Sequence, residues 1–288
     1  MSYLDRLDDC NSRDLSAYRP LVVDGQGVGL LNAEMAAALA DHGDVFAVTD
    51  RAVTLVDGLR GYDARTAAVD AVVHRLVERG LVPRWRGEAY RVGTGFHAPA
   101  LFELDRGAVA NFGVLGFGVH VNGFVRGPGD EIHMWIGRRA ANKPSAPNKL
   151  DHIVAGGQPA GLGLFENLVK ECAEEADIPA DLAGRARPVS ATSYIVERPE
   201  GLRRDVLFNY DLELPADFTP KNTDGEVAAF YLWPLAQVME TVRETREFKF
   251  NCAVIVIDFL IRHGRIPPEH PEYLDLQRRM RRDIAVRV

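Results

Sequence analysis

The sequence predicts an α/β protein in which a mixed sheet lies between helices, an α/β/α sandwich, preceded by a small α+β unit. Two observations predict this architecture. Strand-like apolar runs alternate with amphipathic helical runs from residue 112 onward, and a glycine-rich turn joins the apolar run 153–155 to a helical pattern that ends near residue 178. Hydrophobic residues form 47% of the chain, which is enough for the sizeable core that such a fold requires.

Residues 1–111 are expected to form the small α+β domain. A helix is predicted near 31–41, strands near 44–56, and a second helix over 63–79 that Gly80 ends. The second helix has an amphipathic pattern, with Val72 and Leu76 on its apolar face. After residue 112 the pattern changes to apolar runs interrupted by glycines, so the domain boundary is predicted there.

Residues 112–288 are expected to form the sandwich. The segment 127–130, Gly-Pro-Gly-Asp, predicts a turn between the first two strands, and 198–201 predicts a turn between the next two. The expected strands are 114–125, 131–137, 188–197, 205–214 and 227–232, and helices are expected near 234–245 and 251–263.

A helix with three carboxylates follows the glycine pair Gly156 and Gly157. Glu171, Glu174 and Glu175 stand at positions i, i+3 and i+4, so their side chains lie over one helix surface. Like charges at this spacing repel, and a divalent cation is a physical reason to gather them. Mg²⁺ or Mn²⁺ fits such all-oxygen ligation best. The alternative interpretation is an ordinary solvated acidic face.

From Gly156 to Ile178 the chain resembles the signature of the Nudix hydrolases, G-x5-E-x7-R-E-U-x-E-E-x-G-U, where U is aliphatic. The resemblance implies that Glu171, Glu174 and Glu175 bind the metal and that Lys170 stands where the family has arginine.

Three positions depart from the signature: Leu162 replaces the early glutamate, Lys170 the arginine, and Asp177 the late glycine. Lysine keeps the charge but loses the bidentate fork of arginine. Asp177 can adopt the left-handed conformation that ends a helix. Leu162 removes a supporting carboxylate, for which Glu166 is a candidate substitute.

Further motifs resemble the branch of the family related to the Nudix part of fungal thiamine pyrophosphokinases, including its extra N-terminal domain. They lie at 85–88, 112–123, 135–157, 224–227 and 247–264. This resemblance implies hydrolysis of thiamine diphosphate to the monophosphate, preferentially of damaged oxo or oxy forms, and a homodimer. Two alternatives stay open: an enzyme for oxidised nucleoside diphosphates such as 8-oxo-dGDP, and a catalytically silent ligand sensor.

The chemistry of a diphosphate assigns roles to further residues. Glu174 and Glu175 are the first metal ligands expected, Glu171 is a ligand or the base, and Glu226 is a distal carboxylate that completes the site. Cations upstream of the glycine loop are expected to contact the phosphates together with Gly156 and Gly157; these cations are Arg138, Arg139, Lys143 and Lys149.

Aromatic and imidazole side chains have two interpretations each. Aromatic residues in the N-terminal domain form either core or a stacking wall for a flat ring; they are Trp85, Tyr90, Phe96 and Phe102. His120 and His152 are expected to be structural, with a catalytic role as the alternative.

Charge and cysteine content limit the classes of function. The net charge of −7 excludes a nucleic-acid backbone binder of the usual basic kind, and the basic cluster 277–282 is expected on a solvated helix. The cysteines at 10, 172 and 252 are odd in number and widely spaced, which predicts neither a disulfide framework nor a zinc site. Without an apolar signal or membrane-length run, the sequence predicts a cytoplasmic protein with no membrane partner.

Overall fold

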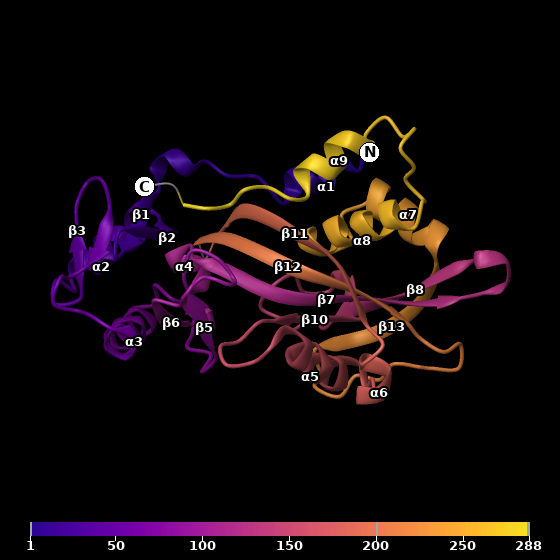
Figure 1. Ribbon diagram of the computed structural model, residues 1–288, viewed down its shortest axis with the longest axis horizontal. Helices are drawn as coiled ribbons and strands as arrows, with labels where there is room; N and C mark the ends of the chain where they lie inside the picture. The colour runs from indigo at the N-terminus through magenta and orange to yellow at the C-terminus, as the bar shows by residue number, and fades with distance from the viewer. Residues whose placement is uncertain (1, 200, 287–288) are drawn as a thin grey trace.

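The computed structural model describes residues 2–199 and 201–286, and a seven-stranded mixed sheet is its largest element (Figure 1). Its main path runs β11-β12-β7-β8-β13, with β10 paired to β7 and β9 paired to β8. The strands are β7 (Leu115–Arg126), β8 (Ile132–Arg139), β9 (Leu150–His152), β10 (Val154–Gly157), β11 (Arg187–Arg198), β12 (Gly201–Glu213) and β13 (Val227–Pro234). The pair β7–β12 is parallel and the other pairs are antiparallel, so the sheet is mixed, as predicted.

Helices cover both faces of this sheet, which confirms the predicted α/β/α sandwich (Figure 1). One face carries α5 (Leu164–Ala176) and the short α6 (Ala180–Ala183); the other carries α7 (Leu235–Glu244) and α8 (Phe250–Arg262). The apolar stripe of α5, on the face away from its carboxylates, is buried, with Leu168, Cys172 and Ala176 fully enclosed. α8 is buried from Asn251 to Ile261 because it lies under α1 and against the sheet.

The N-terminal region contains a second sheet, of order β2-β1-β4-β3, and a separate hairpin, β5–β6. Its strands are β1 (Arg19–Val23), β2 (Gln26–Leu31), β3 (Phe46–Val48), β4 (Val53–Leu55), β5 (Ala89–Val92) and β6 (Phe102–Asp105), and its helices are α2 (Ala33–Ala40), α3 (Tyr62–Glu78) and α4 (Val109–Phe112). α2 and α3 occur where the sequence predicted helices. One hydrophobic core joins these elements between Leu21 and Val114.

The hairpin β1–β2 and the strands β5 and β6 were absent from the sequence prediction. The signal for the first hairpin was present: Asp24 and Gly25 both have positive φ and connect Val23 directly to Gln26. An Asp-Gly pair between apolar runs is a strong hairpin signal. The glycines of β2 weaken its strand pattern and so mask this signal.

Each end of the chain lies against the region formed by the opposite end of the sequence. α1 (Leu4–Asp9) packs against α8 and α9 (Tyr273–Arg279), far from the N-terminal sheet (Figure 1). After α9 the chain returns to that sheet, where Ile284 accepts two hydrogen bonds from the Arg204 guanidinium. The division at residue 112 therefore stays a prediction, since two terminal segments cross it.

The sequence predicts that the basic cluster 277–282 is solvated, but two of its arginines contact other elements of the protein. Arg281 donates to Asp258 at 2.7 Å, and Arg279 pairs with Asp8. These contacts hold α9 to α8 and α1. Within the two ranges that the structure describes, no helix has the length and apolar character needed to cross a membrane.

Candidate metal site and substrate pocket

The glycine loop brings the chain very close to two side chains. A Cβ atom on Gly156 would lie 2.3 Å from Cγ of Glu171, and one on Gly157 would lie 1.7 Å from the Tyr90 hydroxyl oxygen. Any larger residue would force these side chains away. The two glycines therefore allow α5 to approach the loop from one side and the N-terminal region to approach it from the other.

The three carboxylates of α5 are not equivalent. Glu175 is buried and accepts a hydrogen bond of 2.8 Å from the Ala155 amide, and the Glu171 side chain is only 13% exposed. The Glu174 side chain is 52% exposed and pairs at 2.7 Å with Lys170, which also contacts Glu171. Glu171 and Glu175 thus face the protein, and Glu174 lies at the edge of this surface.

Two further carboxylates from other elements join Glu175. Glu226, just before β13, and Asp151 of β9 line one small pocket with Glu175. Burial raises the pKa of Glu175 well above its ordinary value, and the charges of Glu171, Asp151 and Glu226 raise it further. Burial likewise raises the pKa of Glu171. Glu171, Glu175 and Glu226 offer oxygen donors of the kind that fits a hard divalent cation.

The departures from the signature have clear structural outcomes. Asp177 ends α5 in the left-handed conformation, with φ 54°, and Pro179 follows, as the sequence predicted. Glu166 does not lie among the carboxylates; it is exposed and accepts a hydrogen bond from the Gly163 amide at the start of α5. Leu162 lines a pocket on the other side of the loop.

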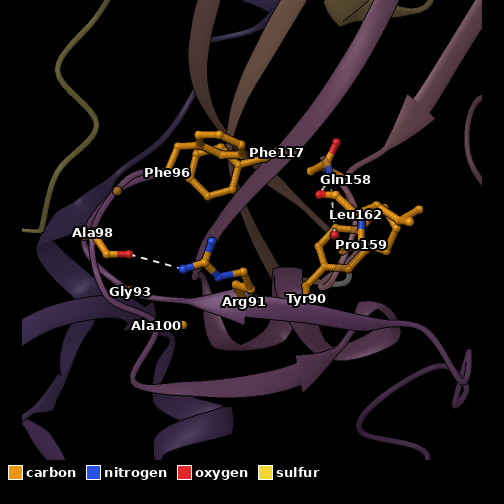
Figure 2. A pocket seen from close by; sticks show the side chains of 11 residues that line it. Tyr90, Arg91, Gly93, Phe96, Ala98, Ala100, Phe117, Gln158, Pro159 and Leu162 are labelled. Atoms are coloured by element: carbon orange, nitrogen blue, oxygen red, sulfur yellow. Dashed lines mark hydrogen bonds between the residues drawn. The ribbon is translucent and has the colours of Figure 1, made fainter. Parts of the chain in front are cut away.

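This second pocket lies between the N-terminal domain and the glycine loop, and we call it the interdomain pocket (Figure 2). One wall comes from β5 and the segment after it, the other from the loop residues 158–162. Phe96 and Phe117 form an aromatic side, and the guanidinium of Arg91 is turned toward Ala98 and donates to its carbonyl at 3.4 Å (Figure 2). The ring of Phe96 also packs edge-to-face on Phe208, with centroids 4.9 Å apart.

Cationic side chains connect the interdomain pocket to the carboxylates. The Arg106 guanidinium lies 6.0 Å from the centre of the Tyr90 ring and 3.5 Å from the position that a Cβ on Gly157 would take. Its positive charge partly offsets the burial that raises the pKa of Glu171. Arg203 also lies near Tyr90 and Arg106. A diphosphate placed beside Gly157 would therefore meet carboxylates on one side and guanidinium groups on the other.

Comparison with known proteins identifies the family. The chain is 46% identical to Nudix hydrolase 24, chloroplastic, of Arabidopsis thaliana over 283 residues, which are 97% of this chain and 77% of that protein. The chain belongs to the Nudix hydrolase family. This Nudix hydrolase is also 43% identical to Nudix hydrolase 20, chloroplastic, of the same plant, again over 97% of the chain and 77% of the relative.

Two other matches cover parts of this Nudix hydrolase. Residues 2–116 match a family model described as Domain of unknown function (DUF4743). A solved structure of a MutT/nudix family protein from Enterococcus faecalis aligns with 56% of this chain and 67% of its own, at 12% identity and a TM-score of 0.42. Family membership, carried by the plant relatives, makes the chain a hydrolase of phosphorus-containing anhydrides, and such hydrolases use a divalent metal ion.

The cations predicted to contact phosphate lie in two places. Arg139 lines the carboxylate pocket but donates to Asp151 at 2.8 Å and to two loop carbonyls, and Lys143 pairs with Glu226. Arg138 donates to the Asn148 carbonyl and Lys149 to the Arg246 carbonyl, away from the glycine loop. Their role in phosphate binding stays a prediction, and Arg91, Arg106 and Arg203 are the cations that sequence reasoning missed. No local pattern marks these three.

The aromatic prediction separates into two pairs. Tyr90 and Phe96 line the interdomain pocket of this Nudix hydrolase. Phe102 is only 1% exposed in the N-terminal core, and Trp85 stacks on His74 with ring centroids 4.1 Å apart. The stacking interpretation therefore fits Tyr90 and Phe96, and the core interpretation fits Phe102.

Proposed function

We propose that this Nudix hydrolase cleaves the diphosphate of damaged thiamine diphosphate, releasing phosphate and the monophosphate. One observation carries the proposal: the buried carboxylates Glu171 and Glu175 lie across the glycine loop from an aromatic pocket that the N-terminal domain closes. Such a layout suits a diphosphate attached to a flat ring. The sequence motifs shared with the thiamine pyrophosphokinase-related branch support thiamine as that ring.

Mg²⁺ is the proposed ion, held by Glu171, Glu175 and Glu226 with Glu174 at the edge; when bound, it neutralises phosphate charge and lowers the pKa of a water molecule. Arg106 and Arg203 bind and orient the diphosphate from the opposite side. The carboxyl group of Glu171 lies against the glycine loop, where it serves as one of these ligands.

The pocket also offers a reason to prefer a damaged ring. Intact thiamine has a positively charged thiazolium, whereas the oxo form has lost that charge. Arg91 lines the pocket, with its guanidinium bonded to the Ala98 carbonyl, so a charged ring bound there lies near a like charge and a neutral ring does not (Figure 2). Phe96 and Phe117 offer ring faces and edges to either form.

The decisive experiment measures Mg²⁺-dependent phosphate release from oxothiamine diphosphate, thiamine diphosphate and 8-oxo-dGDP. We expect the highest kcat/KM with oxothiamine diphosphate and no release by Glu175→Gln. A highest value with 8-oxo-dGDP would replace thiamine with an oxidised nucleotide. Tight binding with no turnover of any diphosphate would make the protein a ligand sensor.

A cytoplasmic location and a homodimer are proposed alongside this activity. Fractionation of the source cells and light scattering on the purified chain test them.

A further inference from the structure

A second group of potential metal ligands lies next to the carboxylate pocket. His120 comes from β7, Asp151 and His152 from β9, and Cys252 from α8, and one ligand atom from each lies within 4.8 Å of all the others. All four residues are buried, the most exposed being Asp151 at 5%. Three separate elements therefore converge on one enclosed point.

The distances inside the group are close to those of a metal site. Nδ1 of His120 lies 3.1 Å from Nδ1 of His152, and the Cys252 thiol lies 2.6 Å from Oδ1 of Asp151, to which it donates. Tetrahedral zinc, with bonds of about 2.0–2.3 Å, separates its ligands by roughly 3.3–3.8 Å. Small outward shifts would place all four atoms around one ion.

The surroundings prepare these groups for ligation. Burial lowers the pKa of His152 to about 4 and that of His120 well below its ordinary value, so each imidazole is neutral and has a free lone pair at neutral pH. Arg139 donates to Oδ2 of Asp151 at 2.8 Å and leaves Oδ1 turned toward Cys252, an outer-shell contact typical of metal sites. Nε2 of His152 is buried and has no hydrogen-bond partner among the described residues, so the present contacts do not satisfy this side chain.

We propose that His120, Asp151, His152 and Cys252 bind one Zn²⁺ ion that links α8 to β7 and β9. Thiolate and imidazole ligands select zinc, whereas the all-oxygen carboxylates nearby suit Mg²⁺, so one protein holds two different metals. On binding, the thiol proton of Cys252 passes to solvent and a sulfur–zinc bond forms. The proposal departs from the expectation drawn from cysteine spacing, because only the fold brings Cys252 to the histidines.

The test uses the full-length chain, independently of any diphosphate substrate. Metal analysis of protein produced with zinc should find one zinc per chain that survives dialysis against Mg²⁺ buffer. Protein produced in zinc-depleted, cobalt-supplemented medium should show the thiolate-to-cobalt charge-transfer band in the near ultraviolet, which all-oxygen ligands cannot produce.

Substitutions test whether the thiolate of Cys252 produces the cobalt charge-transfer band. Cys252→Ser should abolish it and reduce the zinc content at least tenfold, whereas the matched control Cys10→Ser, another buried thiol, should keep both. Glu175→Gln should also keep both, since it alters the carboxylate site alone. Wild-type protein with no bound zinc and no cobalt band overturns the proposal even if a variant does not fold, and a band that persists in Cys252→Ser overturns it as well.

Discussion

The carboxylate site and the interdomain pocket lie on opposite sides of the same glycine loop, yet they are built differently. The loop and α5, a single run of chain, supply Glu171 and Glu175. The pocket combines β5, the segment after it, β7 and the loop, with Arg91 of β5 in its lining, and Arg106 and Arg203 lie near its Tyr90. Glu171 and Glu175 thus come from one local run of sequence, whereas the pocket depends on how two regions of the chain pack.

The two sites also differ in charge. On the α5 side, burial and the neighbouring carboxylates raise the pKa of Glu175, and guanidinium groups gather on the Tyr90 side. A substrate with a diphosphate and a neutral ring satisfies both, because the metal and the arginines share the phosphate charge while the ring contacts aromatic residues. Substitutions on the two sides should therefore have different effects on kcat, KM and selectivity.

The largest effect is expected at the buried carboxylate. Glu175→Gln should lower kcat roughly 10³-fold, since metal stabilisation of the transition state is worth several kcal/mol. Steady-state kinetics at saturating Mg²⁺ measure it, with the exposed Glu240→Gln on α7 as the control. Near-normal kcat in Glu175→Gln would remove the carboxylate site from the reaction.

An intermediate effect is expected at Arg106. Arg106→Ala should raise KM roughly 10- to 100-fold with a smaller change in kcat, because a charge-assisted hydrogen bond contributes about 1.5–3 kcal/mol. Arg79→Ala, which removes a surface pair with Asp41, is the matched control and should leave KM unchanged. An unchanged KM in Arg106→Ala would move the diphosphate away from Gly157.

A smaller effect is expected on selectivity. Arg91→Gln should reduce the preference for oxothiamine over thiamine diphosphate about fivefold, since exposed charge interactions are worth about 1 kcal/mol or less. The ratio of the two kcat/KM values measures this preference. If the ratio stays constant, Arg91 does not sense ring charge.

The smallest effect concerns stability. The pKa of Glu175 is raised above its unfolded value, so its contribution to stability is fully present below about pH 4.5 and is lost as pH rises through the folded pKa. In a buffer that contains a metal chelator, Glu175→Gln should therefore raise Tm by a few degrees at pH 8 and leave it unchanged near pH 4. A change of about 1 kcal/mol in the free energy of unfolding shifts Tm by roughly 2–4 °C. Thermal melts across this pH range check the sign, and a Tm lower than wild type at pH 8 contradicts it.

Local patterns predicted much of the second domain. The stripe on α5, the hairpin β7–β8 and the buried α8 follow from periodicity and turn residues, and Asp177 ends α5 in the expected conformation. The hairpin β1–β2 has an Asp-Gly turn signal that outweighs its glycine-weakened strand, so its existence is also encoded locally. β5 and β6 are short edge segments whose pairing depends on the rest of the domain.

The sequence by itself determined that a glycine loop leads into an acidic helix whose glutamates share one face, because residues three and four apart on a helix lie over the same surface whatever surrounds them. Only the tertiary structure decided that Glu175 is enclosed while Glu174 is exposed, that Arg106 and Tyr90 reach Gly157, and that Cys252 meets two histidines. These arrangements join residues scores of positions apart. Their distances depend on how sheets and helices pack, which no local spacing specifies.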